Sequence, residues 1–546
     1  MKSIITYWNT LRYLKPIQIY GRIFFHLRRP RVNLSPPPQL REANFFKWCK
    51  PPKRRQSMLG PDTFRFLNKT HSLSTIGWDN PEIPKLWRYN LHYFEDLNAD
   101  GAQERSKWHK NLILKWLDDN PPGIGTGWEP YPVSLRIVNW IKWVLAGHIL
   151  PSEAIHSLAI QTRWLMKRLE FHLLGNHLLA NAKALIFAGF FFYGKEAHHW
   201  LSKGLTILEK ELNEQILHDG GHFELSTMYH VLVFEDILDL YNLTRTFNVR
   251  SNRLLKFQTT LREIASKMLY WMDIMCHPDG EISFFNDATF GITPLPKEIK
   301  KYAQRLGITL PNYKDTIIHL KSSGYIKINH QGATFFFDTA PLGPDYLLGH
   351  AHADTLSFEL SLNDQRIIVN SGTSCYGNSS KRIEERGTAA HNTVILNGIN
   401  SSEIWQGFRV ARRARPFGHD IIREGKKLQV KCAHDGYKHL PGKPVHWRTC
   451  TFNNKSLIIK DRIDGKFHCA QANFHLHPNV KILQIVSNNI IHLASKNLYM
   501  KIHVKDGDIQ IHKDYWHPEF GLDIPSNMIS INFKKHEIKT TIKWEQ

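Results

Sequence analysis

Long hydrophobic runs and clustered cysteines are both absent from this sequence of 546 residues. No stretch of about 18 consecutive apolar residues occurs, so we expect no transmembrane helix. The N-terminal region also lacks the compact apolar core and small-residue cleavage site of a secretory signal, which favours a cytoplasmic or membrane-peripheral location. The six cysteines are scattered without CxxC spacing, which excludes a zinc ribbon and argues against a disulfide framework.

Several catalytic signatures are missing as well. The sequence has no phosphate-binding loop, no dinucleotide-binding fingerprint and no serine nucleophile elbow. Acidic residues are in deficit, because 71 Lys and Arg stand against 49 Asp and Glu, a formal net charge of +22. Such a charge attracts nucleic acid, anionic lipid or acidic glycans, although a solvated basic surface explains it equally well. No nucleic-acid-binding motif accompanies it, so we expect no nucleic-acid partner.

The N-terminal region mixes aromatic and basic residues, in the run MKSIITYWNTLRYLKPIQIYGRIFFHLRRP. A basic amphipathic segment of this kind rests on a membrane surface or packs on its own domain, and packing is the simpler expectation. The proline-rich stretch 32–61 that follows is typical of an extended connector. The sequence therefore predicts a basic segment and connector over residues 1–62.

Two periodicities divide the rest of the chain. Over residues 63–310, apolar side chains recur at three- and four-residue spacing between short turns, as in consecutive amphipathic helices of a bundle or toroid. Over residues 320–546, short alternating segments are bounded by Gly, Asn, Asp and Pro, and we expect no helix after about residue 310. The sequence therefore predicts an α+β multidomain protein, with a helical domain followed by an antiparallel β domain.

The densest cluster of titratable residues is GHAHADTLSFEL, residues 349–360. His350, His352 and Asp354 are spaced by two, which on an extended chain points all three side chains to one face. Such a face binds a metal or performs acid–base chemistry. Chance histidines on a solvated edge are the alternative, since the sequence contains 31 histidines. Spacing alone leaves both interpretations open.

Further candidates lie on either side of this cluster. Asn370 ends one expected strand and His391 begins another, and both could converge with the histidines on a zinc ion. In the helical half, Asn176 opens an expected helix, where it is either functional or a simple N-cap. Tyr229 is equally typical of a core tyrosine. Arg136, in the run 128–140, lines either a sugar cleft or a helix interface.

In combination, these motifs resemble a known family. GNH, DGGHFELSTMYH, GHAHAD, NSGTSCYG and AHNTV, in this order, are similar to the heparinase II/III and alginate lyase type of polysaccharide lyase. The resemblance covers roughly residues 85–540 and is strongest over 345–400. It implies an incomplete (α/α) toroid followed by an antiparallel β-sandwich. It also implies β-elimination on an acidic, uronic-acid-containing polysaccharide, a periplasmic location, and a link to capsule or exopolysaccharide metabolism.

The resemblance assigns a role to each matching residue. Asn176 and His177 would neutralise the uronate carboxylate or take part in proton abstraction. Tyr229 would protonate the leaving glycosidic oxygen and serve as base for one substrate epimer. His350 would assist at the carboxylate or abstract the C5 proton, and Tyr376, after the NSG turn, would contact substrate. A different class of function is a glycan-binding or assembly protein that keeps the fold with little or no catalysis.

A structural zinc ion is the cofactor that the resemblance implies. His352, Asn370 and His391 match the positions that bind it, but the family usually has aspartate where this sequence has Asn370. A neutral amide is a weaker ligand than a carboxylate, and Asp354 is the nearby residue that could compensate. The elimination chemistry does not require the metal.

Overall fold

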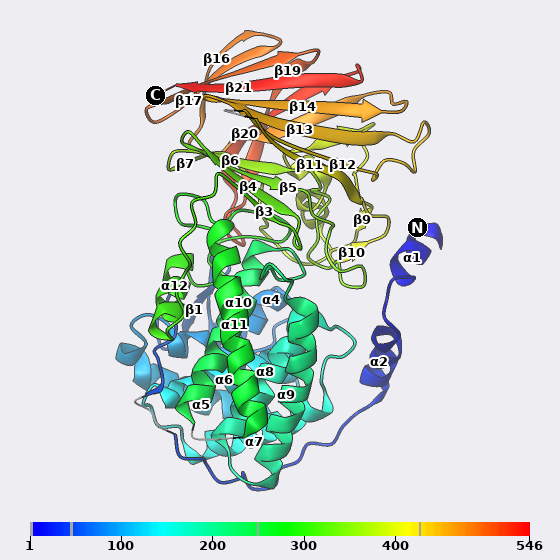
Figure 1. Cartoon of the computed structure of the whole chain (residues 1–546). Helices are drawn as coiled ribbons and strands as arrows, with labels where there is room; N and C mark the ends of the chain where they lie inside the picture. Colours follow the sequence, from blue (N-terminus) through cyan, green and yellow to red (C-terminus); the bar gives the residue numbers. More distant parts are fainter. Residues whose placement is uncertain (1–3, 44–46, 248–250, 425–426, 546) are drawn as a thin grey trace.

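The computed structural model describes residues 4–43, 47–247, 251–424 and 427–545. The long helices form one domain and the larger sheets form a second domain beside it (Figure 1). In the described part of the chain, no helix is long and apolar enough to cross a bilayer.

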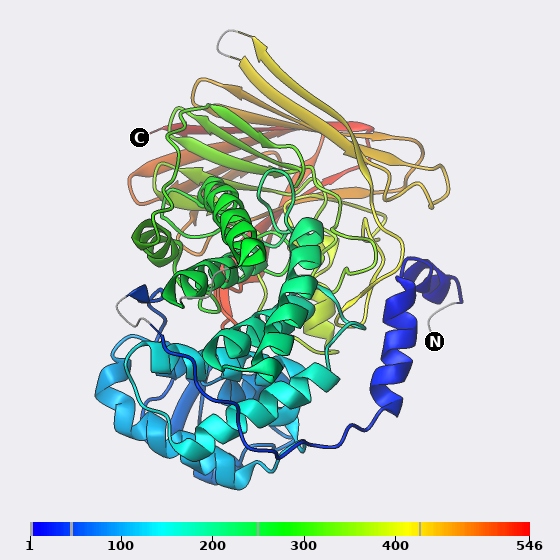
Figure 2. The ribbon, with the colours of Figure 1, turned by 60° about the horizontal axis from the view of Figure 1, so that its bottom comes forward.

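Two short helices at the N-terminus stand along one side of the molecule, α1 (Ile4–Leu11) and α2 (Pro16–Leu27) (Figure 1). The chain then runs extended across the far end of the helical domain (Figure 2). Side chains of that domain hold it there, since Arg163 donates to the carbonyl oxygens of Ser35 (2.6 Å) and Pro36 (2.9 Å). Consecutive prolines cannot continue a helix, and arginine satisfies these two carbonyls of the extended chain instead.

The helical domain begins with a small hairpin, β1 (Thr63–Phe66) and β2 (Lys69–Ser72). Its helices are α3 (Leu73–Ile76), α4 (Lys85–Tyr93), α5 (Ser106–Asp119), α6 (Pro130–Leu145), α7 (Ser152–Lys167), α8 (Gly175–Phe191), α9 (Lys195–Gln215), α10 (Thr227–Thr246), α11 (Asn252–Ile274) and α12 (Pro296–Arg305). Helix α8 is apolar on nearly all sides because it lies inside this ring of helices. It meets α9 through glycines: a Cβ at Gly189 would lie 2.6 Å from Leu201 Cβ.

The β domain contains three large antiparallel sheets. One has the order β3-β4-β5-β6-β7, one β11-β12-β13-β14-β21-β18-β17-β16, and one β19-β20-β15-β8. Their strands are β3 (Ile317–Leu320), β4 (Tyr325–His330), β5 (Ala333–Asp338), β6 (Phe358–Leu362), β7 (Gln365–Ile368), β8 (Val394–Leu396), β11 (Pro416–Glu424), β12 (Lys427–His434), β13 (Val445–Asn453), β14 (Ser456–Asp464), β15 (Ala470–His475), β16 (Lys481–Ser487), β17 (Ile490–Ser495), β18 (Leu498–Lys505), β19 (Asp508–Trp516), β20 (Ile524–Phe533) and β21 (Glu537–Glu545).

Aromatic residues fill the space between these sheets. Phe335 of β5 packs on Phe452 of β13 with ring centroids 5.3 Å apart, and Phe358 of β6 packs on Phe474 of β15 at 5.5 Å. The inward-facing side chains of the three sheets form one buried apolar cluster. This arrangement of sheets facing one another over a common core is that of a β-sandwich.

The β half also contains a helix that the sequence analysis did not expect. Helix α13 (Ser380–Glu385) is six residues long, and the Ser379 hydroxyl accepts the backbone N–H of Arg382 at its start (3.1 Å). A helix this short completes fewer than two turns and displays no amphipathic period, so the expectation of no helix beyond about residue 310 was wrong here. The minor pair β9 (Ile404–Trp405) and β10 (Arg409–Val410) follows.

A loop from the helical domain is inserted between the two domains. This loop follows α11, and its residue Phe284 donates its N–H to Glu359 of β6 (3.0 Å), while His277 contacts the same carboxylate (2.8 Å). Asp287 donates its N–H to the carbonyl of His350 (3.0 Å), and its own carbonyl accepts from the Ser226 hydroxyl at the start of α10 (2.5 Å). The loop thus joins α10 to the histidine-rich segment of the β domain.

Candidate active site

A cavity of about 1480 Å³ lies between the helical and β domains. The residues from the helical domain that line it include Tyr89, Tyr131, Asn176, His177, Glu224 and Tyr229, and those that follow in the chain include Tyr346, His350, Tyr376, Phe408 and Arg409. Clefts that bury a drug-sized ligand measure roughly 300–1,000 Å³. The cavity is therefore large enough for more than one sugar unit.

Tyr229, His350 and Tyr376 meet in this cavity. Tyr229 lies in the first turn of α10, where its backbone N–H donates to the Ser226 hydroxyl (3.1 Å) in an N-cap. Its ring stacks on the His350 ring with centroids 3.9 Å apart and planes 16° apart. Its hydroxyl lies 3.0 Å from the Tyr376 hydroxyl. The structure therefore brings three of the sequence-predicted residues together.

Both tyrosines keep their protons at neutral pH. Burial raises the pKa of Tyr229 well above its ordinary value of 10, and the neighbouring Tyr376 and Asp287 raise it further. Burial, followed by the charge of Asp287, likewise raises the pKa of Tyr376. A neutral phenol donates a proton, so Tyr229 is poised as an acid rather than as a base.

His350 is held by a buried carboxylate. Its Nδ1 hydrogen-bonds Glu224, a residue just before α10. Burial raises the pKa of Glu224, but the charge and hydrogen bond of His350 outweigh it, and the pKa is lowered overall. The Glu224 carboxylate is thus ionised and orients the imidazole. With Nδ1 engaged, Nε2 is the ring nitrogen that can exchange a proton with a substrate.

A strained turn presents Asn176 and His177 to the same cavity. Leu174, with φ +63°, and Gly175, with φ +55°, reverse the chain immediately before these residues. A left-handed conformation costs a leucine about 1–3 kcal/mol, and such strain is typical of functional turns. Asn176 lies inside α8, whose N-cap is Leu174, so the N-cap interpretation of Asn176 was wrong. Burial lowers the pKa of His177, but Glu170 at 3.1 Å raises it above 6.5 overall, which favours the imidazolium.

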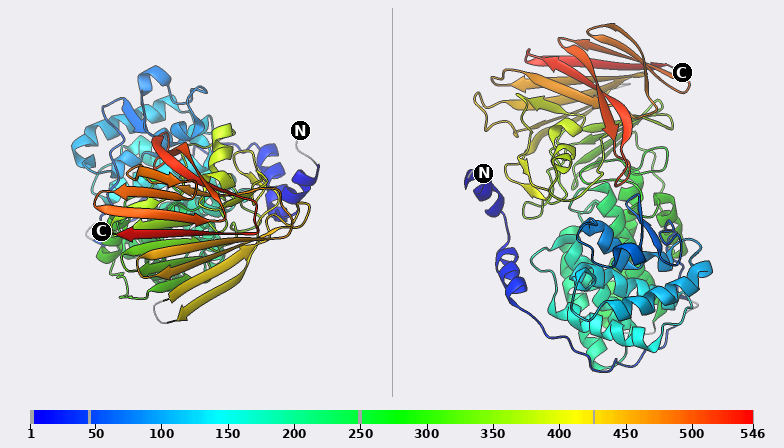
Figure 3. Two further views of the ribbon diagram at one scale, coloured as in Figure 1. Left: turned by 90° about the horizontal axis from the view of Figure 1, so that it is seen from above. Right: turned by 180° about the vertical axis from the view of Figure 1, so that it is seen from behind.

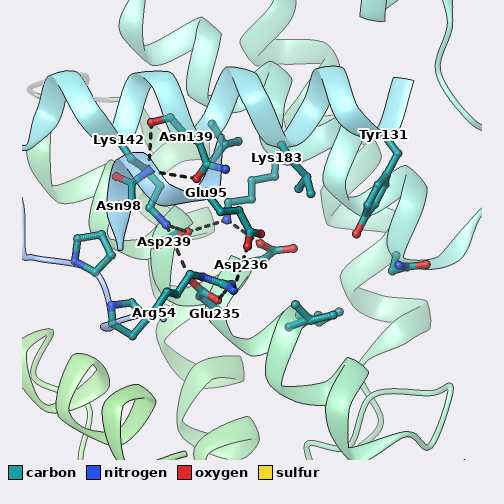
Figure 4. A pocket seen from close by; sticks show the side chains of 17 residues that line it. Arg54, Glu95, Asn98, Tyr131, Asn139, Lys142, Lys183, Glu235, Asp236 and Asp239 are labelled. Atoms are coloured by element: carbon teal, nitrogen blue, oxygen red, sulfur yellow. Dashed lines mark hydrogen bonds and ion pairs between the residues drawn. The ribbon is translucent and has the colours of Figure 1, made fainter. Parts of the chain in front are cut away.

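Buried ion pairs hold the helices behind this turn (Figure 4). Lys183 of α8 contacts Asp236 and Asp239 of α10, both at 2.6 Å, and Lys142 of α6 contacts Asp239 at 2.7 Å. The pairs surround a small polar cavity of about 60 Å³, which Asn176 also lines. Removing one partner of such a pair leaves a buried charge without its counterion, so the pairs fix the spacing of α6, α8 and α10.

Arg136 does not reach the cleft, and its predicted role in substrate binding was wrong. The side chain is fully buried in the helical domain, where it donates to Gln161 (2.9 Å) and to the carbonyls of His92 (3.2 Å) and Gly127 (2.8 Å). Its guanidinium also lies 3.9 Å from the centre of the Trp116 ring. Arg136 is therefore a structural residue that ties α6 to its neighbours.

The GHAHAD segment does not place its three titratable groups on one face. It is a loop, because β6 begins only at Phe358 and Leu356 has a φ of +64°. His350 faces the cleft, whereas His352 is buried against Asp287 (2.8 Å), and Asp354 accepts the backbone N–H of Asn286 (3.1 Å). The two-residue spacing predicted a common face only on the assumption of a strand, and residues 350–354 form none.

The three predicted zinc ligands lie side by side as a hydrogen-bonded chain. His352 Nδ1 is 3.1 Å from His391 Nε2, and His391 Nδ1 is 3.2 Å from Asn370 Oδ1. Asn370 and His352 thus contact opposite nitrogens of the His391 ring, while zinc requires donors that converge. Within the described ranges, no group of three or more His, Cys, Asp or Glu side chains is arranged to hold a metal. As placed, the three residues do not fit a three-ligand zinc site.

Sequence reasoning missed the acidic and basic partners of this site. Glu224 orients His350, Glu170 supports His177, and Asp287 pairs with Arg382 of α13 (2.6 Å). Glu224 and Glu170 lie within seven residues of a predicted site residue, but no spacing rule separates them from surface glutamates. Asp287 and Arg382 are 95 residues apart, so their pairing appears only in the folded chain.

Solved structures with the same architecture define the class of fold. A crystal structure of heparinase III superimposes with a TM-score of 0.69 at 19% identity, over 86% of this chain and 79% of that chain. A chondroitin AC lyase of Streptomyces coelicolor superimposes with a TM-score of 0.53 at 8% identity, over 89% of this chain and 77% of that chain. The predicted fold, a helical toroid followed by an antiparallel β-sandwich, is confirmed.

Models of protein families show which family the chain belongs to. The heparinase II/III N-terminus model matches residues 102–306, and the heparinase II/III-like C-terminal model matches residues 314–545. The chain belongs to the heparinase II/III family. A heparin-sulfate lyase of Bacteroides stercoris is 28% identical over 314 residues, which are 53% of this chain and 44% of the relative. A heparin-sulfate lyase of Pedobacter heparinus is 24% identical over 422 residues, which are 70% of this chain and 60% of the relative. The matches thus span about half the length of these curated relatives.

Replacing Glu224 with glutamine should lower kcat at least about tenfold, because a neutral amide does not stabilise the imidazolium that His350 forms when it accepts a proton. The effect on stability should depend on pH. The pKa of Glu224 is lower in the folded protein than its ordinary 4.5, so its stabilising contribution is complete above pH 4.5 and is lost as pH falls through the folded value. Urea unfolding should therefore show a difference between Glu224→Gln and wild type near pH 7 that shrinks below pH 4.5. An unchanged kcat would remove Glu224 from this role.

Elemental analysis of the purified protein can test the zinc site that the sequence predicted. Because the three residues do not converge, we expect substoichiometric zinc and no change in Tm after dialysis against a chelator. Stoichiometric zinc that disappears in His391→Ala would contradict this expectation and show that the side chains rearrange around the ion.

Proposed function

We propose that this protein is a polysaccharide lyase that cleaves a uronic-acid-containing polymer by β-elimination. The observation that carries the proposal is the stacking of protonated Tyr229 on His350, whose Nδ1 is held by Glu224. An acid and a base thus meet at one point of a cleft large enough for an oligosaccharide. Membership of the heparinase II/III family supports the same reaction.

The first requirement of this reaction is a counter-charge for the substrate carboxylate. The C5 proton of a uronate is weakly acidic, and its removal leaves an enolate-like dianion. Asn176 supplies an amide donor, and His177, whose pKa Glu170 raises, supplies positive charge next to it. The formal net charge of +22 helps to attract the polyanion to the cleft.

The second requirement is a proton acceptor and a proton donor. His350 Nε2 takes the C5 proton while Glu224 stabilises the imidazolium that forms. Tyr229 gives its proton to the leaving O4 oxygen, and the Tyr376 hydroxyl, 3.0 Å away, stabilises the resulting phenolate by a hydrogen bond. The C4–O4 bond breaks, and the electron pair from the C5–H bond becomes the C4–C5 double bond of the product.

The named relatives favour glycosaminoglycans as substrates. Both curated relatives are called heparin-sulfate lyases, and we infer a related sulfated or uronate-rich polymer for this chain. A glycan-binding or assembly role without catalysis is the competing function. It predicts binding of the polymer with no formation of the unsaturated uronate.

Activity can be measured by the ultraviolet absorbance of the unsaturated uronate on heparin, heparan sulfate, alginate and hyaluronan. We expect absorbance to rise on at least one polymer, and Tyr229→Phe to lower kcat by about 100-fold or more without changing Tm. Tyr499→Phe, at a tyrosine exposed on β18, is the matched control. Binding without any absorbance would favour the assembly role, and full activity of Tyr229→Phe would exclude Tyr229 as the acid.

We also propose that the N-terminal helices contact a membrane surface. Tyr20, Phe24 and Leu27 recur at helical spacing on α2 and are 59%, 58% and 77% exposed, and Trp8 on α1 is 64% exposed. The basic run that follows α2, including Arg28, complements anionic lipid headgroups. An exposed apolar face with flanking positive charge is the pattern of an interfacial helix.

Sedimentation with vesicles of phosphatidylcholine and phosphatidylglycerol tests this contact. The full chain should sediment with them, and Trp8→Ser with Phe24→Ser should leave most of it in the supernatant. A double change of Leu483 and Ile485 to serine on β16, which are 53% and 56% exposed, is the matched control. Equal loss in both variants, or no sedimentation of wild type, would overturn the proposal.

A further inference from the structure

The N-terminal helix pair, α1 and α2, bridges the two domains (Figures 1 and 3). Helix α1 is held by the β domain, since Trp405 donates its indole N–H to Thr10 (3.0 Å) and packs on Tyr7 with ring centroids 5.2 Å apart. Helix α2 is held by the helical domain, since Phe25 packs on His172 at 4.2 Å and its carbonyl accepts from Arg168 (2.7 Å). The pair is therefore attached on both sides of the gap between the domains.

The inner face of this helix pair forms one wall of the cleft. Thr10, Leu14, Gln18 and Arg22 line the same 1480 Å³ cavity as Tyr229 and His350. Gln18 fixes the orientation of α2, because its amide donates to the carbonyl of Tyr346 (3.1 Å). Arg22 follows Gln18 by one helical turn and therefore lies on the same face. The helix pair thus places an arginine in the cleft.

Arg22 lies within electrostatic range of Arg409, which lines the cavity from β10. Burial lowers the pKa of Arg409, and the charge of Arg22 lowers it further. Neither guanidinium has a carboxylate partner among the residues that the structure describes. Two like charges that line one cavity repel each other, and an anion bound between them would offset this repulsion.

Three neighbouring arginines outside the cleft do have carboxylate partners. Arg412 pairs with Glu403 (3.2 Å), and Arg413 and Arg415 both pair with Asp345 (3.0 and 2.6 Å). The acidic residues of this region therefore form ion pairs with arginines outside the cleft.

His172 adds an unsatisfied polar group at the same place. It lines the cavity, its side chain is more than nine-tenths buried, and its Nδ1 has no hydrogen-bond partner within the described ranges. Burial lowers its pKa to about 4, although Glu170 opposes this, and the charge of Arg22 contributes to the lowering. A neutral imidazole offers one N–H donor to a bound anion.

We propose that Arg22, Arg409 and His172 form an anion subsite at the N-terminal end of the cleft, which binds a sulfate or carboxylate group of a sugar unit next to the one that reacts. The proposal rests on the proposed lyase function. Guanidinium groups bind such planar or tetrahedral oxyanions through paired N–H donors. Phe408, the residue before Arg409, packs on Tyr376 (5.3 Å) and His350 (6.2 Å), so the subsite lies beside the reactive residues.

Calorimetric binding of a sulfated heparin hexasaccharide to the full chain tests the subsite. Tyr229→Phe is used as background so that the oligosaccharide is not cleaved. Changing Arg22 and Arg409 together to glutamine should weaken Kd by about tenfold or more, because two charge-assisted contacts are lost. Arg28→Gln, which removes the same charge from the chain just after α2, should change Kd less than about twofold. Arg409→Lys should retain part of the affinity because the charge remains.

The corresponding hexasaccharide without sulfate distinguishes the two sources of the anion. A loss confined to the sulfated ligand assigns the subsite to sulfate, and an equal loss on both assigns it to carboxylate. An unchanged Kd in the double variant, or the same loss in Arg28→Gln, would overturn the proposal. Binding does not require turnover, so a wild type that binds the hexasaccharide but forms no unsaturated uronate would contradict the lyase function and leave the subsite supported.

Discussion

The buried pairing of Asp287 with Arg382 is the interaction on which the site depends. Asp287 belongs to the helical domain and Arg382 to α13 of the β half, and both side chains are inaccessible to solvent. Arg382 and His352 outweigh the effect of burial, so the pKa of Asp287 is strongly lowered and the pair is ionised. The Arg382 guanidinium also lies over the Tyr376 ring at 4.8 Å. One ion pair therefore fixes both the junction of the domains and the tyrosine beside Tyr229.

In the helical domain, two similar turns place Asn176 and Tyr229 in the cleft. Leu174 and Leu225 both adopt positive φ values, +63° and +57°, immediately before α8 and α10. Asn176 and Tyr229 follow within four residues. Because the helices themselves are held by buried ion pairs, the strained turns are supported by rigid elements. The positions of these groups therefore follow from how the helices begin.

Sequence reasoning was most successful where the signal is periodic or local. The change from helical to alternating spacing predicted the order of a helical and an antiparallel β half, and the motifs around Asn176, Tyr229, His350 and Tyr376 identified residues that share one cleft. It failed for Arg136, whose three acceptors lie 9 to 44 residues away in the chain and bury it. Pairings between distant segments have no local signature, so tertiary contacts decide them.

The double attachment of the N-terminal helix pair holds the two domains together on the side of the cleft away from the chain connection. The two domains are joined by the chain after α12 at one side and clasped by α1 and α2 at the other (Figure 1). Separating the domains on this side would break the contact of α1 with Trp405 or those of α2 with His172 and Arg168. Contacts such as that of Trp405 with Thr10 therefore oppose any widening of the cleft.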